Sequence, residues 1–335
     1  MILVTGTAGF IGSHVAEALL ADGEQVFGLD NINDYYDQRL KHARLERLFR
    51  YNGFGFRKLD ISEPDAVLAL ADEMPDISAI VHLAAQAGVR YSIENPFAYV
   101  RSNVMGQVAM LELARRLRAL RHFVYASSSS VYGANTKVPF AVSDPVLAPC
   151  SLYAATKRAD ELIAHTYAHL YGIACTGLRF FTVYGPWGRP DMAYYSFTAA
   201  ILAGRPIRIF NHGEMWRDFT FIDDVVQGTL QALRRPPAVT PPHAVYNLGN
   251  CHPQKLMDFV GVLERLAGRK AVLVLEPMQP GDVISTYADI EDSRRDLQFE
   301  PVTPIEAGLR KFVDWYREYH AKAAPCVRES VARLA

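Results

Sequence analysis

The sequence contains little that would place it in a specialised class of protein. Its 335 residues include only four cysteines, Cys150, Cys175, Cys251 and Cys326, whose wide spacing fits neither a disulfide framework nor a metal site. The formal net charge at pH 7 is −1, so there is no basic excess of the kind that binds nucleic acid or an anionic membrane surface. No apolar run reaches the roughly 18 residues that span a membrane, and no leader precedes the first strand-like residues. We therefore expect a cytoplasmic protein with no metal, and with neither nucleic acid nor membrane as a partner.

The first half of the chain alternates short apolar runs with segments of helical period. The expected strands are residues 2–5, 25–29, 54–59, 79–83, 122–126 and 174–179, and the expected helices are 11–21, 38–49, 64–71, 97–118 and 152–170. Such alternation is typical of an α/β protein with a Rossmann-like, doubly wound parallel sheet.

The alternation ends near position 180. Beyond it we expect a helix at 195–203, a short strand at 207–210, a helix within 219–234 that begins after position 220, and a final amphipathic helix at 305–319. We divide the chain into a Rossmann domain, residues 1–180 with a return near 217–250, and a smaller α/β domain, residues 181–216 and 251–335.

A glycine-rich turn, TGTAGFIG at residues 5–12, lies between the first strand and the first helix. Gly6 permits the tight turn, Gly9 lets backbone amides approach a pyrophosphate, and Gly12 allows the helix to pack closely on the strand. The helix N-terminus adds partial positive charge. An ordinary tight turn would also use glycine, but the strand–turn–helix context favours a dinucleotide site.

Asp30 ends the second strand, 18 residues after Gly12, close to the roughly 20 expected for a ribose-binding acid. Its carboxylate would accept hydrogen bonds from ribose hydroxyls and repel a 2′-phosphate, which favours NAD over NADP. Asp60, after the third strand, is a candidate for the adenine amine with the amide of Ile61, although an aspartate there is also a good helix cap.

The segment LYAATK places Tyr153 and Lys157 four residues apart in a helical stretch, so they share one face. A neighbouring ammonium and an oxidised nicotinamide both favour the phenolate form of a tyrosine. Tyr153 is therefore a candidate proton acceptor for a sugar or alcohol hydroxyl. The same spacing is common in surface pairs, so the interpretation depends on the upstream dinucleotide turn.

TGTAGFIG, Asp30, HLAAQAGVR, SSSSVYG and YAATK together resemble the extended short-chain dehydrogenase/reductase superfamily over nearly the whole chain. The resemblance implies a Rossmann domain that holds NAD, a second domain that holds a UDP-sugar, and a homodimer formed through residues 97–118 and 152–170. The implied NAD contacts are Gly6, Gly9, Phe10, Ile11, Gly12, Asp30, Asn31, Lys41, Asp60, Ile61, Leu83, Ala84, Ala85, Asn103, Tyr153 and Lys157.

The four serines 127–130 bear on the branch of the superfamily. The resemblance implies that Ser128, four residues before Tyr132, shares the substrate hydroxyl with Tyr153. Similar dehydratases and decarboxylases have a glutamate where this chain has Ser130, and a neutral hydroxyl cannot do that proton transfer well. The serine therefore favours epimerisation.

The segments RFFTVYGPWGRPDMA and DNINDYYDQRLKHAR resemble the UDP-glucuronate 4-epimerases. That resemblance implies that Ser129, Ser130, Thr182 and Arg189 bind the sugar carboxylate and keep a β-keto acid intermediate from losing carbon dioxide. It also implies that Arg217, the segment 279–282 with Asp282, and Arg294 bind or cover the diphosphate. A UDP-glucose/UDP-galactose 4-epimerase, a UDP-glucuronate decarboxylase and an inactive NAD-binding regulator stay open as alternatives.

Overall fold

The computed structural model describes residues 1–279 and 281–323. Three features of the sequence analysis lie wholly or partly outside these residues: Cys326, position 280 of the segment 279–282, and the end of the second domain.

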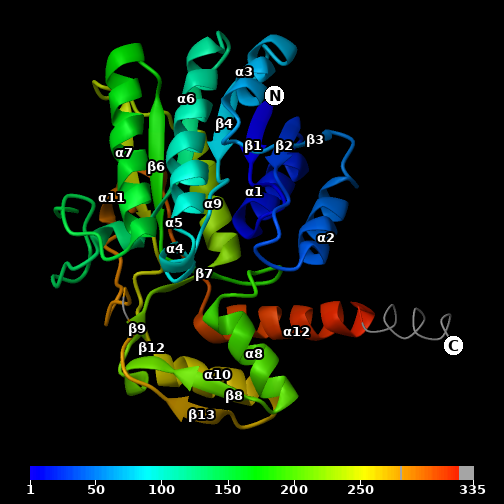
Figure 1. Cartoon of the computed structure of the whole chain (residues 1–335), viewed down its shortest axis with the longest axis vertical. Helices are drawn as coiled ribbons and strands as arrows, with labels where there is room; N and C mark the ends of the chain where they lie inside the picture. The colour runs from blue at the N-terminus through cyan, green and yellow to red at the C-terminus, as the bar shows by residue number, and fades with distance from the viewer. Residues whose placement is uncertain (280, 324–335) are drawn as a thin grey trace, which may run out of the picture.

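Seven parallel strands form the central sheet in the order β11-β6-β5-β4-β1-β2-β3, which confirms the α/β, Rossmann-like prediction (Figure 1). Their bounds are β1 Ile2–Thr5, β2 Val26–Asp30, β3 Phe54–Lys58, β4 Ala79–His82, β5 His122–Ser128, β6 Cys175–Phe180 and β11 His243–Leu248. The sequence predicted the first six. It did not predict β11, because a short apolar run after a proline-rich connection has no clear periodicity of its own.

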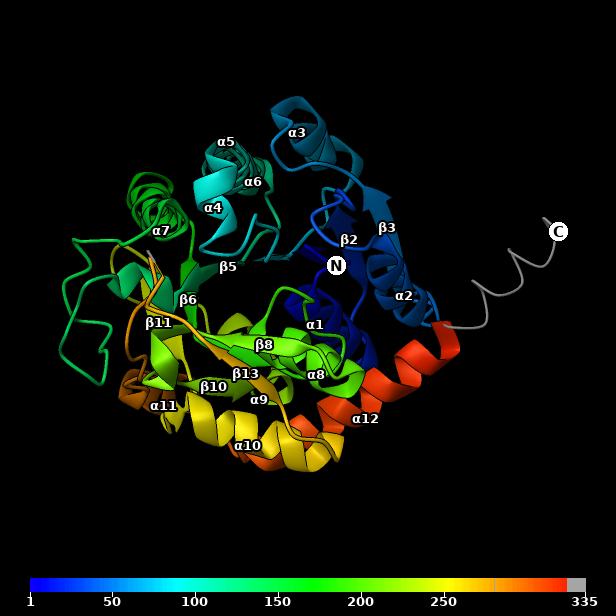
Figure 2. The same cartoon turned by 60° about the horizontal axis from the view of Figure 1, so that its bottom comes forward.

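Helices cover both faces of the sheet (Figure 2). On one face lie α3 Pro64–Glu73, α6 Gly106–Arg116 and α7 Leu152–Tyr171, and on the other α1 Phe10–Ala21, α2 Gln38–Leu48 and α9 Ile222–Leu233. The central strands are therefore buried from both sides, and every residue of β1 and β6 is buried.

Two expected helices differ in the structure. The stretch 97–118 is not one α-helix, because α5 Pro96–Tyr99 is joined to α6 through a π-helical turn, Val100–Met105. A single π-helical turn cannot be recognised from the spacing of apolar residues in the sequence. The helix expected within 219–234, after position 220, is α9 and begins at Ile222. The three residues before it, Phe219–Phe221, form the buried strand β10 beside β7 Thr182–Tyr184.

A smaller lobe lies beyond the carboxyl ends of the sheet strands (Figure 1). It contains the strand pairs β8 Pro206–Ile209 with β13 Val272–Leu275, and β9 Trp216–Arg217 with β12 Gln254–Lys255. Its helices are α8 Ala193–Ala203, α10 Leu256–Ala267 and α12 Ile305–Ala323. Helix α11 Glu291–Leu297 packs instead beside β11 and α9 of the sheet domain, and α4 Tyr91–Glu94 lies near α5 and α7. Apolar side chains of this lobe, such as Phe259 and Phe312, belong to the same buried cluster as Val4 of β1.

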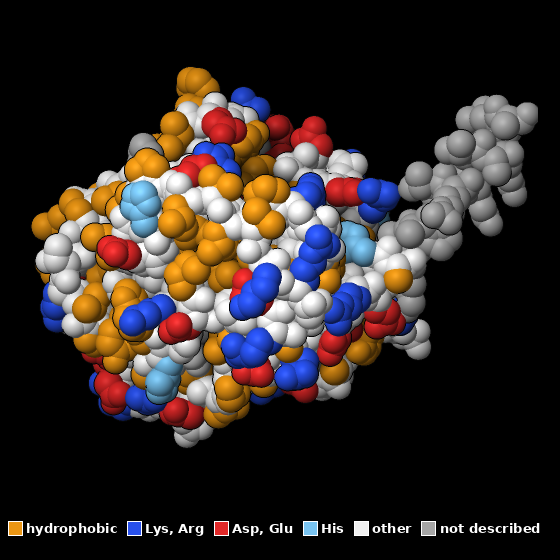
Figure 3. All heavy atoms as spheres, turned by 90° about the horizontal axis from the view of Figure 1, so that it is seen from below, with side chains coloured by type: hydrophobic (Ala, Val, Ile, Leu, Met, Phe, Trp, Pro, Cys, Tyr) orange, Lys and Arg blue, Asp and Glu red, His pale blue; other side chains and the backbone are white. Residues whose placement is uncertain are grey.

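The face seen from below carries basic and acidic side chains interspersed with apolar ones (Figure 3). In the described part of the chain, no helix combines the length and the apolar character needed to cross a membrane.

Candidate active site

A cavity of about 620 Å³ lies where the carboxyl ends of the sheet strands meet the smaller lobe. Ligand sites of open α/β sheets lie at this edge, and the volume suits a large ligand. Its lining includes Gly6, Ser128 and Tyr153 from the sheet side and Arg189 and Arg217 from the other side. One cavity therefore brings together segments that the sequence assigned to cofactor and to substrate.

The glycine-rich turn has the geometry that a phosphate site needs. Gly6 has φ +74°, a conformation that favours glycine, and a Cβ there would lie 2.9 Å from the backbone nitrogen of Ala84. Helix α1 begins after Gly9 and, among the described residues, no side chain caps it. Because Phe10 and Ile11 of its first turn line the cavity, the free amides and the helix dipole can receive a diphosphate there.

Asp30 lies at the end of β2 and also lines the cavity. Its carboxylate accepts hydrogen bonds from the backbone amides of Ala8 (3.1 Å) and Ile32 (2.8 Å). Burial raises the pKa of this carboxyl, while the nearby Lys41 ammonium and the two amides oppose that shift. The arrangement fixes an acceptor beside the phosphate turn, as a ribose-binding acid requires.

The other expected cofactor residues fall into two groups. Six of them line the cavity: Asn31, Lys41, Ile61, Leu83, Ala84 and Ala85. Asp60 and Asn103 are not among the lining residues. Asp60 accepts from Asn31 and Ser62, and Asn103 bonds both backbone polar groups of Gln86, so each supports neighbouring backbone or side chains.

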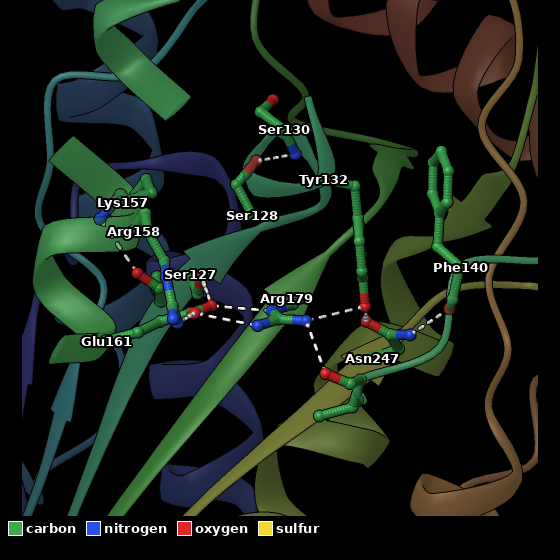
Figure 4. A network of polar contacts seen from close by, with 12 residues as sticks. Ser127, Ser128, Ser130, Tyr132, Phe140, Lys157, Arg158, Glu161, Arg179 and Asn247 are labelled. Carbon is green, nitrogen blue, oxygen red and sulfur yellow. Dashed lines mark hydrogen bonds and ion pairs between the residues drawn. The ribbon is translucent and has the colours of Figure 1, made fainter. Parts of the chain in front are cut away.

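The four serines do not share one role (Figure 4). Ser127 donates its hydroxyl to Glu161 of α7 at 2.6 Å. Ser128 ends β5, and its hydroxyl accepts from the amide of Ser130 at 3.2 Å, which starts the 3-10 turn Ser129–Tyr132. All four serines are among the residues that line the cavity, but the hydroxyl of Ser127 is already bonded to Glu161.

A buried network below this turn was not found by sequence reasoning. Arg179 forms a bidentate pair with Glu161 at 2.8 and 2.9 Å and also donates to the hydroxyl of Tyr132. Tyr132 donates in turn to Asn247, whose amide reaches the carbonyl oxygen of Phe140 (Figure 4). Because both charges are buried and paired, they hold the serine turn rigidly to strands β6 and β11.

Tyr153 and Lys157 lie in the first turns of α7, which Ser151 caps by accepting from the amide of Ala154. Both residues line the cavity, as their shared helical face predicts. The Lys157 ammonium donates to the carbonyl of Ala126 and to Asp160, each at 3.0 Å. Burial raises the pKa of Asp160 to about 6 despite this ammonium.

Thr182, Ser129, Ser130 and Arg189 all line the cavity, so the structure brings the expected carboxylate donors into one chamber. Arg189 already has a partner: its Nε and Nη2 pair with Asp191 at 3.1 and 2.5 Å. Burial disfavours the Asp191 carboxylate, but Arg189 outweighs this and lowers its pKa. Nη1 is the guanidinium nitrogen not bonded to Asp191.

At the other end of the cavity, Arg217 and Asp282 are lining residues, together with Arg90. Arg217 donates to the carbonyls of Trp216 and Ile284, and Arg90 lies 3.5 Å from Asp282. Arg294 is different. It does not line the cavity, and its guanidinium pairs with Glu291 and Glu300 on α11 and beyond, so its location does not support the expected role at the diphosphate.

The sequence matches the NAD dependent epimerase/dehydratase family over residues 2–249. UDP-glucuronate 4-epimerase 4 of Arabidopsis thaliana is 49% identical over 336 residues, which cover 96% of this chain and 76% of that protein. The probable UDP-glucuronate 4-epimerase of Rhizobium meliloti (strain 1021) is 47% identical and covers 96% of this chain and 98% of that protein.

The solved structures that resemble this chain include further 4-epimerases of UDP-sugars. UDP-glucuronic acid 4-epimerase of Bacillus cereus, in complex with UDP-glucuronic acid and NAD, matches with a TM-score of 0.87 and 35% identity, covering 95% of this chain and 99% of that one. The UDP-glucose 4-epimerase of Thermotoga maritima, with UDP-glucose, matches with a TM-score of 0.86 and 29% identity, with the same two coverages.

Proposed function

The chain belongs to the NAD-dependent epimerase/dehydratase family, and we propose that it interconverts UDP-glucuronate and UDP-galacturonate as an NAD-dependent 4-epimerase. The observation that carries this proposal is the composition of one cavity. Ser128, Tyr153 and Lys157 line it together with Thr182 and Arg189. A proton-transfer set and a carboxylate-binding set therefore face the same space.

The residues present fit NAD. An uncapped helix N-terminus faces the cavity beside a glycine turn that a Cβ would obstruct, and Asp30 offers a buried acceptor next to it. Bound NAD supplies a hydride acceptor and donor at carbon 4 of the sugar. Gly9, Phe10, Ile11 and Gly12 would receive its diphosphate, and Asp30 its adenosine ribose.

Tyr153 acts as the acid–base group. Its phenolate takes the proton of the 4-hydroxyl and returns it when the opposite epimer forms. The Lys157 ammonium lies on the same helix face, where the Ala126 carbonyl and Asp160 hold it in place. Ser128 orients the hydroxyl by sharing its hydrogen bond.

Thr182, Ser129, Ser130 and Arg189 bind the carboxylate on carbon 5. The 4-keto sugar is a β-keto acid, which loses carbon dioxide when the breaking bond aligns with the carbonyl π system. Fixed donors that hold the carboxylate out of this alignment suppress the loss. Ser130 is neutral, so the turn also lacks the carboxyl that assists decarboxylation in similar enzymes.

The main alternative function within the family is that of a UDP-glucose/UDP-galactose 4-epimerase. A hydroxymethyl group in place of the carboxylate would offer no charge to Nη1 of Arg189, the nitrogen that Asp191 does not bind, which weakens binding. The intact Ser128–Tyr153–Lys157 set speaks against an inactive regulator.

The decisive assay incubates purified protein with UDP-glucuronate and no added nucleotide. We expect UDP-galacturonate by proton NMR, with no change in mass, because NAD is regenerated in each turnover and can stay bound. A product lighter by carbon dioxide would instead identify a decarboxylase, and exclusive turnover of UDP-glucose would identify a neutral-sugar epimerase.

Asp30→Asn should weaken NAD binding about 10-fold, the order expected when a hydrogen bond to a charged acceptor is lost. The measurement is the NAD released from a known amount of denatured protein, with the dissociation constant from calorimetry. Asp34→Asn, in the exposed loop nearby, is the matched control. Equal NAD content in all three proteins would remove Asp30 from the cofactor site.

We further propose a homodimer through residues 97–118 and 152–170, the cytoplasm as location, and the two-domain division given above. Exposed apolar side chains on these two segments support the first, among them Phe97 (79% exposed), Met105 and Leu162. Sedimentation of the purified protein tests the dimer directly.

A further inference from the structure

Arg44 is a fully buried cation whose hydrogen bonds join the glycine-rich turn to the segment that precedes Arg189. It lies on α2, and its side chain is 0% exposed. Within the described part of the chain, no carboxylate lies within ion-pairing distance of it, and all of its bonded acceptors are neutral oxygens. A buried charge kept without an acidic partner calls for an explanation beyond packing.

The hydrogen bonds of Arg44 use the whole guanidinium fork. Nε and Nη2 donate to the carbonyl of Trp187 at 3.0 and 2.6 Å, and Nη2 donates also to the carbonyl of Gly188 at 3.1 Å. Nη1 donates to the carbonyl of Ala8 at 2.9 Å and to the hydroxyl of Tyr36 at 2.6 Å. These five bonds match the five N–H donors of the side chain.

The two segments that Arg44 joins belong to different parts of the site. Ala8 lies in the glycine-rich turn, and its amide is bonded to Asp30. Trp187 and Gly188 are 143 and 144 positions away from Arg44 and directly precede Arg189. One side chain therefore connects the turn that receives the cofactor diphosphate to the segment that carries the carboxylate-binding arginine.

The segment before Arg189 needs such support because its backbone is strained. Trp187 has φ +62°, which is unfavourable for a bulky residue. Its ring packs outward against Trp315 and beneath Arg47, while its carbonyl turns inward to Arg44. The amide of Arg189 donates to the hydroxyl of Tyr194.

We propose that Arg44 is a specificity-positioning residue: it fixes the Trp187–Gly188 backbone so that Arg189 is held at the sugar carboxylate. This inference rests on the proposed function, since it assigns Arg44 to the choice between charged and neutral UDP-sugars. Lysine at this position could not replace the planar fork, because its ammonium cannot reach both carbonyls and Ala8 with the same geometry.

The test compares Arg44→Lys with Arg47→Lys. Arg47 is one turn further on the same helix. It contacts the ring of Trp187 and pairs with Glu17, but within the described residues it bonds neither the Trp187 carbonyl nor Ala8. Dissociation constants for UDP-glucuronate and UDP-glucose are measured by calorimetry on the NAD-loaded proteins. We expect the preference for UDP-glucuronate to fall about 10-fold in Arg44→Lys, because a small misplacement of a binding group has effects of this order, and to be unchanged in Arg47→Lys.

If Arg44 had only a structural role, its replacement would lower the yield of folded protein or weaken the binding of both UDP-sugars equally. An unchanged preference for UDP-glucuronate over UDP-glucose in folded Arg44→Lys therefore overturns the inference. If that variant does not unfold cooperatively, Tyr36→Phe decides, because it removes one acceptor of the fork and should lower the preference about 3-fold by loosening one hydrogen bond. An unchanged preference in Tyr36→Phe then overturns the inference. Wild-type protein that neither turns over nor prefers UDP-glucuronate would instead contradict the proposed function.

Discussion

Replacing Tyr153 by phenylalanine should lower kcat by about 10³- to 10⁴-fold, the upper range for loss of a positioned general acid–base group. The ring is half-buried, and its edge packs on Tyr99 with the ring centroids 6.0 Å apart. Phenylalanine keeps that packing and removes only the hydroxyl. We therefore expect nearly normal binding of UDP-glucuronate, an unchanged melting temperature and almost no turnover.

The matched control is Tyr171→Phe, at the exposed end of the same helix. It should keep wild-type kinetics, because Tyr171 is remote in the chain from the residues that line the cavity. Turnover in Tyr153→Phe within a factor of about 10 of wild type, well short of the loss expected for a general base, would mean that another group moves the proton. The measurement is a progress curve by NMR, with substrate binding measured separately by calorimetry.

Removing Arg189 should have the largest effect on substrate binding. Arg189→Ala deletes a charged hydrogen-bond donor, so we expect KM for UDP-glucuronate to rise by about 10²-fold. It should also yield some UDP-pentose, because a less restrained carboxylate can align for loss of carbon dioxide. Thr182→Ala should act in the same direction with a smaller change, about 5- to 10-fold in KM, as expected for one neutral hydrogen bond.

The Thr182 variant matters because Arg189→Ala also removes the ion-pair partner of Asp191, which, among the described residues, keeps only the side-chain hydrogen bond from Tyr35. Arg118→Ala, at an exposed position, controls for loss of positive charge. If both cavity variants keep the wild-type KM and mass spectrometry finds no UDP-pentose, these residues do not restrain the carboxylate. Product analysis by mass separates this from a simple loss of stability.

The parts of the site that sequence predicted are those defined by local spacing. The glycine turn follows from its position between a strand and a helix, and the common face of Tyr153 and Lys157 follows from a separation of four residues in α7. Asp30 follows from its place at a strand end. Such features depend on chain geometry over a few residues, so they can be predicted without knowledge of the packing.

The expectations that changed were those that depend on contacts between distant segments. Arg294 looked suited to a diphosphate, yet packing places it against Glu300 and outside the cavity. The sequence assigned no role to Ser127, and only the structure shows that its hydroxyl bonds Glu161 of α7, 34 positions further along the chain.

The sequence by itself determined the class of fold, the position of the dinucleotide turn and the proton-transfer pair, because each follows from periodicity or from the spacing of a few residues. Only the tertiary structure decided which buried charges support the turn and the proton-transfer pair. Arg44 reaches the Trp187 carbonyl across 143 positions, and Glu161 pairs with Arg179 of the neighbouring strand. The reason is physical: a buried charge is tolerated where its hydrogen-bond partners converge, and that convergence exists only after the helices have packed on the sheet.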